Sequence, residues 1–335
     1  MTRFVIYALG TLWLGSCFMS EHAGTWTVMT WNVENLFDGY SDGGEYREFD
    51  PLRGDWDERL FQRRVERTLE VILQSHDSKP DIVALQELEN LRVFTTLMSS
   101  GLKQAGYRWG AFYPSGASVG CGILSLVPIE RVVVIESGDW EGRSLRPMLA
   151  CEMQFQGQSL WVVNGHWKSP WNGRKETEGA RIQEAQALLR MLQTLQRISP
   201  GSGIVIAGDL NTPGDGALNP SALGPLGSAA VMETTANPIL AQQESLFYDP
   251  SPQGHPPGTY WFQGKWGRPD RFLLAPSGLL KTGWFVEQCR VVAHPQQLTA
   301  QGYPKRWNEK QEEGYSDHLP LWLWISLPLE TNVAR

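Results

Sequence analysis

Short apolar runs that stop abruptly at polar residues recur along the chain. In the clearest of them, residues 204–207 are apolar and rich in β-branched side chains, and Gly208, Asp209 and Asn211 follow within four positions. Such a run predicts a buried strand that ends in a loop. Because ligands of α/β sheets bind at strand ends, Asp209 and Asn211 are candidates to activate water or to hold a metal-bound phosphate. Taken alone, the pair is also explained by a turn in which the Asp209 side chain bonds to the backbone.

The chain has the size and composition of a folded globular protein. Its 335 residues are 41% hydrophobic, which is ample for a packed core. Its 29 basic and 36 acidic residues give a net charge of −7, so polyanion binding requires a local basic patch rather than an overall positive field. Strand-like runs recur to the end of the chain with no repeat or linker between halves. We therefore expect one domain over residues 25–327, followed by a tail over residues 328–335.

The N-terminal residues predict export. Arg3 precedes an apolar stretch over residues 4–14, which has the length of a signal-peptide core and is too short to span a membrane. Residues 14–17, Leu-Gly-Ser-Cys, resemble the lipobox of bacterial lipoproteins. On that resemblance residues 1–24 are a leader with a short tether, and Cys17 becomes the lipidated first residue of a periplasmic or cell-surface protein. Ordinary cleavage nearby would instead release a soluble periplasmic or secreted protein.

Export would permit disulfides among the remaining cysteines. Cys121, Cys151 and Cys289 are an odd number, which allows one bridge and one free thiol. Cys121 and Cys151 lie in successive strand-like segments and are candidates to pair. Three buried, unpaired cysteines are the alternative.

Other apolar runs also meet polar residues at their ends. In an extended segment, positions 160, 162, 164 and 166 share one face, so Asn164 and His166 project together. Apolar residues at helical spacing predict helices over residues 58–75, 90–105 and 180–197. Residues 38–57 are polar and lack a period, so we expect a long loop there, placed to cover a site. The further polar residues at the ends of strand-like runs are Asn32, Glu87, Asp270, Asp317 and His318.

Several basic residues are candidates to bind a phosphate. Arg143 and Arg146 precede a strand-like run, and either would hold a phosphate by a bidentate contact, although a surface salt bridge explains each nearly as well. Lys168 directly follows the segment that carries His166. Arg181 stands at the start of a predicted helix, from which it can point back to the same place.

Six short motifs follow one another in a characteristic order. They are Trp-Asn-Val-Glu-Asn at 31–35, Leu-Gln-Glu-Leu-Glu at 85–89, Asn-Gly-His at 164–166, Gly-Asp-Leu-Asn at 208–211, Pro-Asp-Arg-Phe at 269–272 and Ser-Asp-His-Leu-Pro at 316–320. Together they resemble the endonuclease/exonuclease/phosphatase superfamily, which includes DNase I-like nucleases, abasic-site endonucleases, inositol polyphosphate phosphatases and bacterial sphingomyelinases. The resemblance implies an α/β fold, a four-layer sandwich in which two central β-sheets pack face to face and helices flank them. It also implies metal-dependent cleavage of a phosphoester.

The resemblance implies roles for the acidic and amide residues. Asn32 and Glu87 correspond to the metal site, with Asp317 as a further ligand. Oxygen ligands of this kind suit Mg²⁺ or Mn²⁺ rather than Zn²⁺. Asp209 corresponds to the group that orients or deprotonates the attacking water, and Asn211 to an amide that positions the phosphate or the nucleophile.

The resemblance also implies roles for two histidines. His318 corresponds to a protonated imidazole that stabilises the transition state, with Asp270 fixing its orientation. His166 corresponds to a histidine that protonates the leaving oxygen, and typical abasic-site endonucleases lack it. Pro269 and Arg271 depart from the usual fifth motif of the family, whereas Asp270 matches its acidic position.

We expect an exported phosphodiesterase, foremost a nuclease that acts on DNA or RNA by in-line attack of an activated water. A phosphatase or phospholipase C-like enzyme that acts on inositol phosphates or lipid head groups is the alternative. A non-catalytic binding protein on the same fold is a second alternative, against which the retained acidic residues and histidines argue. No protein partner is predicted, and membrane contact is expected only through a lipid on Cys17.

Overall fold

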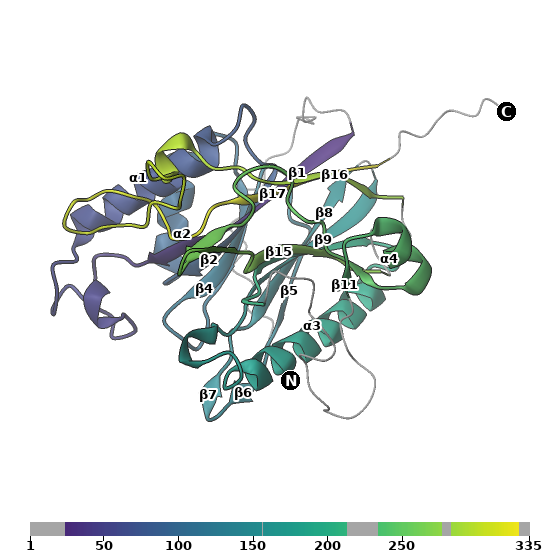
Figure 1. The fold of residues 1–335 in the computed structure, drawn as a ribbon, viewed down its shortest axis with the longest axis horizontal. Helices are drawn as coiled ribbons and strands as arrows, with labels where there is room; N and C mark the ends of the chain where they lie inside the picture. Colours follow the sequence, from purple (N-terminus) through teal and green to yellow (C-terminus); the bar gives the residue numbers. More distant parts are fainter. Residues whose placement is uncertain (1–23, 156, 213–233, 277–282, 328–335) are drawn as a thin grey trace.

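The computed structural model describes residues 24–155, 157–212, 234–276 and 283–327. Two β-sheets pack face to face, and helices cover their outer faces (Figure 1). The predicted four-layer α/β sandwich is therefore confirmed. Cys17, almost all of the expected leader and the C-terminal tail lie outside the described residues. Among the helices described, none has both the length and the apolar character that crossing a membrane requires.

The first sheet holds the strands nearest both ends of the described chain. Its longest strand pairs in parallel with β2 on one side and antiparallel with β17 on the other. In spatial order the strands are β16 (Phe285–Val291), β17 (Leu321–Ser326), β1 (Thr25–Leu36), β2 (Ile82–Leu88), β4 (Gly120–Ser125) and β3 (Trp109–Tyr113).

The second sheet is built from the middle of the chain. Its strands β9 and β10 run parallel, and β15 lies antiparallel to β10. In spatial order the strands are β11 (Thr234–Thr235), β12 (Phe247–Tyr248), β15 (Asp270–Leu274), β10 (Gly203–Asp209), β9 (Gln158–His166), β8 (Met148–Phe155) and β5 (Arg131–Ile135).

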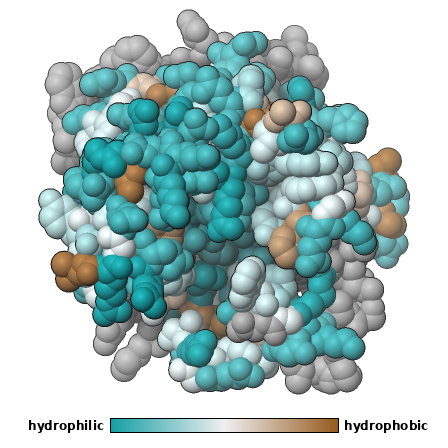
Figure 2. All heavy atoms as spheres, turned by 60° about the vertical axis from the view of Figure 1, so that its left-hand side comes forward, coloured by the Kyte–Doolittle hydropathy of each residue, from teal (hydrophilic) through white to brown (hydrophobic). Residues whose placement is uncertain are grey.

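Alternation along the strands divides the core into layers. In β1, Val28 packs between the sheets, whereas Met29 and Trp31 pack under the helices. The helices α1 (Glu58–Gln74) and α2 (Leu91–Leu97) cover the first sheet, and α3 (Glu178–Ile198) covers the second (Figure 1). The face turned forward in Figure 2 is mostly hydrophilic and hollowed near its centre.

The remaining elements are short. They are α4 (Pro238–Glu244), the hairpins β6 (Asp139–Trp140) with β7 (Arg143–Ser144) and β13 (Tyr260–Phe262) with β14 (Lys265–Gly267), and the 3-10 helices Arg47–Phe49, Pro170–Asn172 and Pro295–Gln297.

Two sequence predictions are refined by the structure. The helix expected over residues 90–105 ends its regular part at Leu97 and continues as a π-helical turn, Met98–Leu102, because Gly101 takes a φ of 137° that an α-helix does not allow. Cys121, Cys151 and Cys289 are all buried and unpaired, so the alternative without a disulfide is the correct one.

Candidate active site

The ends of six strands meet at one edge of the sandwich. Because β1 runs parallel to β2, and β9 runs parallel to β10, the carboxyl ends of each pair lie together. Asp209 pairs in register with His166 on one side and with Asp270 on the other. The antiparallel strands β15 and β17 begin at this same edge. Polar residues distant in the sequence are thereby collected in one place.

The backbone at this edge has unusual conformations. Glu87 has a φ of 66° and Asn211 a φ of 50°, values in the left-handed region that residues other than glycine seldom adopt. The pairing of β2 shifts register between Gln86 and Leu88, on either side of Glu87. A bulge of this kind re-aims a side chain, and backbone strain of this kind is typical of functional sites.

An amide links the two carboxylates of the site. The Asn32 Nδ2 group donates to Glu87 Oε1 at 2.9 Å and to Asp209 Oδ2 at 3.1 Å. The backbone N–H of Asn35 donates to Glu87 Oε2 at 2.7 Å. These bonds join the first sheet to the second and fix the separation of Glu87 and Asp209.

His166 lies between the same two carboxylates. Its Nε2 atom is 3.6 Å from Glu87 Oε1 and 3.7 Å from Asp209 Oδ2, and its ring is buried. Burial, together with the positive charges of Arg146 and His318, lowers the pKa of His166 well below its ordinary value. The imidazole is therefore neutral near pH 7. Its Nδ1 atom has no hydrogen-bond partner within the part of the chain that the structure describes.

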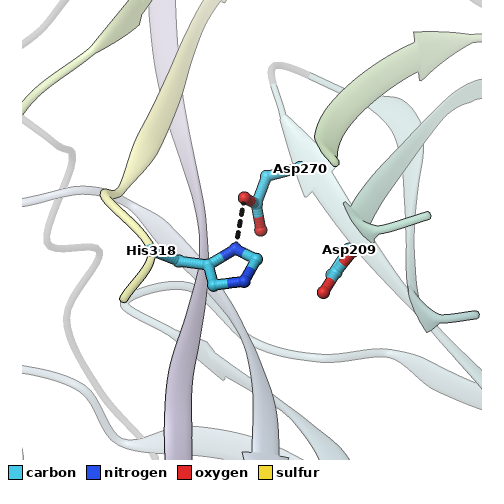
Figure 3. A group of neighbouring side chains, drawn as sticks. All are labelled: Asp209, Asp270 and His318. Atoms are coloured by element: carbon cyan, nitrogen blue, oxygen red, sulfur yellow. Dashed lines mark hydrogen bonds and ion pairs between the residues drawn. The ribbon is translucent and has the colours of Figure 1, made fainter. Parts of the chain in front are cut away.

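The second histidine is held by an aspartate. His318 Nδ1 and Asp270 Oδ2 lie 2.7 Å apart (Figure 3). Thr259 Oγ1 donates to the same oxygen at 2.5 Å. Burial by itself lowers the pKa of His318, but the charge and hydrogen bond of Asp270 outweigh it and raise this pKa well above its ordinary value. In Figure 3 the carboxylate of Asp209 lies near the other side of the imidazole. A cationic imidazole thus stands beside a carboxylate.

Asp209 forms a turn with the backbone and also lies in the candidate site. Its Oδ1 atom accepts from the Asn211 backbone N–H at 3.0 Å, which is the turn that the sequence allowed. The Asn211 amide donates to Trp167 O at 3.0 Å. Burial raises the pKa of Asp209 to about 7, His318 and Asn32 acting against the rise. The turn therefore presents a carboxylate that exchanges protons near neutral pH.

Glu34 is a site residue that the sequence analysis did not assign. It is buried, and its Oε2 atom accepts from the backbone N–H of Asp317 at 3.0 Å. Arg306 forms an ion pair with its other oxygen. Asp317 Oδ1 in turn lies 3.9 Å from His318 Nε2. Glu34 therefore positions the Asp317–His318 segment, and its place in the motif at 31–35 was the available signal.

Three predicted phosphate-binding residues lie near one another, and two of them, Arg146 and Lys168, lie close enough to His166 to lower its pKa. Arg146 and Lys168 are half-buried, whereas Arg143 is exposed in β7. Burial and the charges of Arg146 and Arg143 lower the pKa of Lys168. The three positive charges therefore lie close enough to act on one another. They define a basic patch in an acidic protein.

Asn164 differs from the prediction. It is fully buried between the sheets, where its Nδ2 group donates to Leu85 O and to Gly122 O at 2.9 Å each. Its Oδ1 atom accepts from Gln86 Nε2 at 2.7 Å. All its polar groups are thus used within the core, so the prediction that Asn164 binds substrate is corrected to a structural role.

Arg181 is also corrected. It is buried. Its guanidinium donates hydrogen bonds to the chain segment that follows β9 and does not face an open surface. The bonds go to Lys168 O at 3.1 Å, Thr177 Oγ1 at 2.8 Å and Arg174 O at 2.7 Å. Arg181 therefore positions the segment that carries Lys168.

The donor set fits a hard divalent cation. Ligand atoms of Asp209, Asp270 and His318 lie within 4.8 Å of one another, but His318 and Asp270 are already bonded to each other and are poor candidates for ligands. Glu87 offers carboxylate oxygens, the neighbouring Asn32 amide turns its Nδ2 group to Glu87 and its Oδ1 atom to the Glu34 backbone N–H, and Asp317 is half-buried at the same edge. Crowded carboxylates of this kind suit a divalent cation that prefers oxygen ligands.

A family model decides the classification. The model described as the endonuclease/exonuclease/phosphatase family matches residues 27–327. The chain belongs to this family. Members of the family are nucleases and phosphatases that hydrolyse phosphoester bonds, typically with a divalent metal. None of the curated protein sequences compared with the chain matches it.

Solved structures share the fold at low sequence identity. Truncated TDP2 from Caenorhabditis elegans is 16% identical, with a TM-score of 0.54 over 90% of this chain and 97% of that chain. The endonuclease/exonuclease/phosphatase from Bacteroides vulgatus is 16% identical, with a TM-score of 0.56 over 91% and 99%. ANGEL2, a 2′,3′-cyclic phosphatase, is 14% identical, with a TM-score of 0.57 over 91% and 96%.

Proposed function

We propose that the protein is a metal-dependent phosphodiesterase whose substrate is DNA or RNA. The observation that carries this proposal is the meeting of two differently charged histidines at one strand edge. His318 is cationic beside Asp270, whereas His166 is neutral between Glu87 and Asp209. Phosphoester cleavage needs both a positive charge for the phosphoryl oxygens and a group that exchanges a proton.

The reaction proceeds by in-line attack of water on phosphorus. Asp209 accepts the proton of the water, and the Asn32 amide keeps the Asp209 carboxylate oriented. The His318 imidazolium stabilises charge on a non-bridging oxygen. The neutral imidazole of His166 donates a hydrogen bond to the leaving oxygen, which takes its proton from solvent, and Asn211 positions the phosphate. A Mg²⁺ or Mn²⁺ ion held by Asn32, Glu87 and Asp317 would neutralise negative charge on the phosphate.

The basic patch supports nucleic acid as the substrate. Arg146 and Lys168 lie near His166, and Arg143 lies near Lys168. Arg174 and Lys175 are exposed on the segment that follows. Polyanion binding depends on such phosphate contacts and weakens steeply with salt. The patch supplies them locally although the whole chain carries a net charge of −7.

A substrate panel tests the proposal. The mature protein is incubated with Mg²⁺ or Mn²⁺ and plasmid DNA, RNA, sphingomyelin, inositol phosphates and bis-p-nitrophenyl phosphate. We expect cleavage of nucleic acid that EDTA abolishes. Cleavage of only inositol phosphates or sphingomyelin would establish the phosphatase or phospholipase alternative. No EDTA-sensitive release from any substrate would leave a non-catalytic binding protein.

Asp209→Asn is the matched variant for this assay. The amide keeps the size of the side chain and the bond from Asn211, but its NH2 group replaces the oxygen that accepts from Asn32, and it cannot accept the proton of the water. We expect a loss of rate on the order of 10²-fold or more while circular dichroism shows that the protein still folds. An unaltered rate would remove Asp209 from the mechanism.

We further propose that the protein is exported and anchored through a lipid on Cys17. Support comes from the apolar stretch over residues 4–14 and the lipobox-like residues 14–17. Labelled fatty acid should be incorporated by the wild type and not by Cys17→Ser. Equal labelling of the two proteins would rule out this anchor, and release of unlabelled mature protein would indicate ordinary cleavage.

A further inference from the structure

A second cluster of carboxylates lies outside the candidate active site. Asp42, Glu45 and Glu89 each present an oxygen atom, and these atoms lie within 4.8 Å of one another. Asp42 and Glu45 belong to the segment that follows β1, and Glu89 directly follows β2. We propose that these three residues bind a Ca²⁺ ion that is separate from the catalytic cation.

Glu89 provides the observation that points to a ligand. The residue is only 8% exposed, and its Oε2 atom accepts from the Asp38 backbone N–H at 2.8 Å. Its Oε1 atom is buried and has no hydrogen-bond partner among the described residues. A buried carboxylate oxygen without a partner is costly, and a cation in the cluster would satisfy it.

The charges around the cluster are not balanced by protein cations. The nearby Arg92 is directed to other acids, because its Nη1 atom lies 3.2 Å from Asp38 Oδ2 and its Nη2 atom lies 2.8 Å from Glu58 Oε1. Across the described ranges, neither Asp42, Glu45 nor Glu89 forms an ion pair with a lysine or arginine. The cluster therefore carries net negative charge.

The backbone holds the two loop carboxylates in place. Glu45 accepts from the backbone N–H of Asp42 and, at 2.9 Å, from that of Gly43. Asp42 Oδ1 accepts from the N–H of Gly44 at 3.1 Å. The carboxylates are thus pre-positioned, and each oxygen retains a lone pair for a cation.

The chemistry of the cluster favours Ca²⁺. All donors are oxygens, which excludes metals that require nitrogen or sulfur. Two oxygens bound to one Ca²⁺ ion at about 2.3–2.6 Å are at most about 5 Å apart, in agreement with the measured spread. Asp42 is exposed, so water can complete a coordination shell of the six to eight ligands that Ca²⁺ takes. Mg²⁺ demands near-ideal octahedral geometry and gives up its water ligands reluctantly, so three carboxylates on one ion suit Ca²⁺ better.

The ion would join two chain segments at the edge of the first sheet. Glu89 lies two residues after Glu87, and its N–H donates to Leu36 O at 3.1 Å. A cation bound by Glu89, Asp42 and Glu45 would link the segment after β1 to the segment after β2. The bound ion would therefore stabilise the fold and hold these two segments in place, and it takes no part in bond cleavage.

Calorimetric titration tests this site on the full-length protein after removal of metal with a chelator. Asp42→Asn with Glu45→Gln should lose one equivalent of bound Ca²⁺ relative to the wild type. Glu87→Gln, which disturbs the catalytic cation instead, should retain that equivalent. A matched control, Glu48→Gln with Asp55→Asn, removes two exposed acids from the same segment and should also retain it.

Thermal unfolding supplies a second readout that needs no substrate. Ca²⁺ at about 100 times its dissociation constant should raise the Tm of the wild type and of Glu87→Gln by about 5 °C. The rise should vanish in the Asp42 and Glu45 double variant. Equal Ca²⁺ stoichiometry in this variant and the wild type would overturn the proposal, and so would an equal rise in Tm.

Discussion

His318 Nδ1 and Asp270 Oδ2 lie 2.7 Å apart, although 48 positions separate the two residues in the chain. Asp270 is the first residue of β15, and His318 precedes β17, so one residue comes from each sheet. Thr259 adds a hydrogen bond to the same carboxylate oxygen. The contact with Asp270 keeps the His318 imidazole charged at the edge where the other candidate residues meet.

Loss of the imidazole should abolish most of the activity. His318→Ala removes the positive charge that stabilises the transition state, and we expect kcat to fall on the order of 10²-fold or more. Steady-state kinetics on the responding substrate, with circular dichroism to confirm folding, measure this. Glu244→Gln, an exposed change on α4, is the control and should retain full activity. Wild-type kcat in His318→Ala would contradict the assignment.

Glu87→Gln should weaken the use of metal. The Gln side chain retains an oxygen that can accept from the Asn35 backbone, but it loses the charge that attracts a divalent cation. We expect the Mn²⁺ concentration for half-maximal rate to rise about tenfold or more. Titration of the rate with Mn²⁺ measures this shift, and an unchanged midpoint would place the metal elsewhere.

Gly208→Ala should destabilise the junction of β9 and β10. Gly208 has a φ of 140°, and a Cβ atom there would lie 2.0 Å from Gly165 O. Because the obstacle is backbone, no side chain can move aside, and we expect a loss of about 3 kcal/mol or more. Urea unfolding measures the change. Gly142→Ala, also at positive φ but with nothing within 4 Å of its Cβ, should cost only about 1 kcal/mol. Equal losses in the two variants would show that φ alone matters.

Glu184 should make stability depend on pH. It is buried in α3, its Oε2 atom accepts from the Lys168 backbone N–H at 2.8 Å, and burial raises its pKa to about 8 against the lowering effect of that bond. The folded state therefore keeps this proton between pH 4.5 and 8, where the unfolded state has lost it. The contribution to stability is complete below pH 4.5 and is lost as the pH rises to about 8.

Glu184→Gln isolates this effect, because its amide cannot ionise and its oxygen can still accept from Lys168. Relative to the variant, the wild type should lose about 1.4 kcal/mol of unfolding free energy per pH unit over that range. Urea unfolding of both proteins at pH 5, 6.5 and 8 measures the difference. A difference independent of pH would contradict a raised pKa, and Glu130→Gln, an exposed change, should show no such trend.

Much of the fold follows from local patterns. The helical period of residues 58–75 and 180–197 corresponds to α1 and α3, and the alternation in residues 160–166 corresponds to the inward face of β9. These patterns can be recognised in the sequence because burying one face of a strand or helix requires apolar residues at the period of its backbone. The polar residues that end the strands were visible for the same reason.

Contacts between distant segments required the tertiary structure. Asn164 appeared to share a polar face with His166, yet the second sheet carries it against Leu85, Gln86 and Gly122 of the first, where it became structural. Nothing local distinguishes it from a residue that faces solvent. Glu34 acquired its role because folding placed Asp317 and Arg306 beside it. Periodicity reports which side of an element is buried, whereas the partner that a polar atom meets there depends on how the two sheets are stacked.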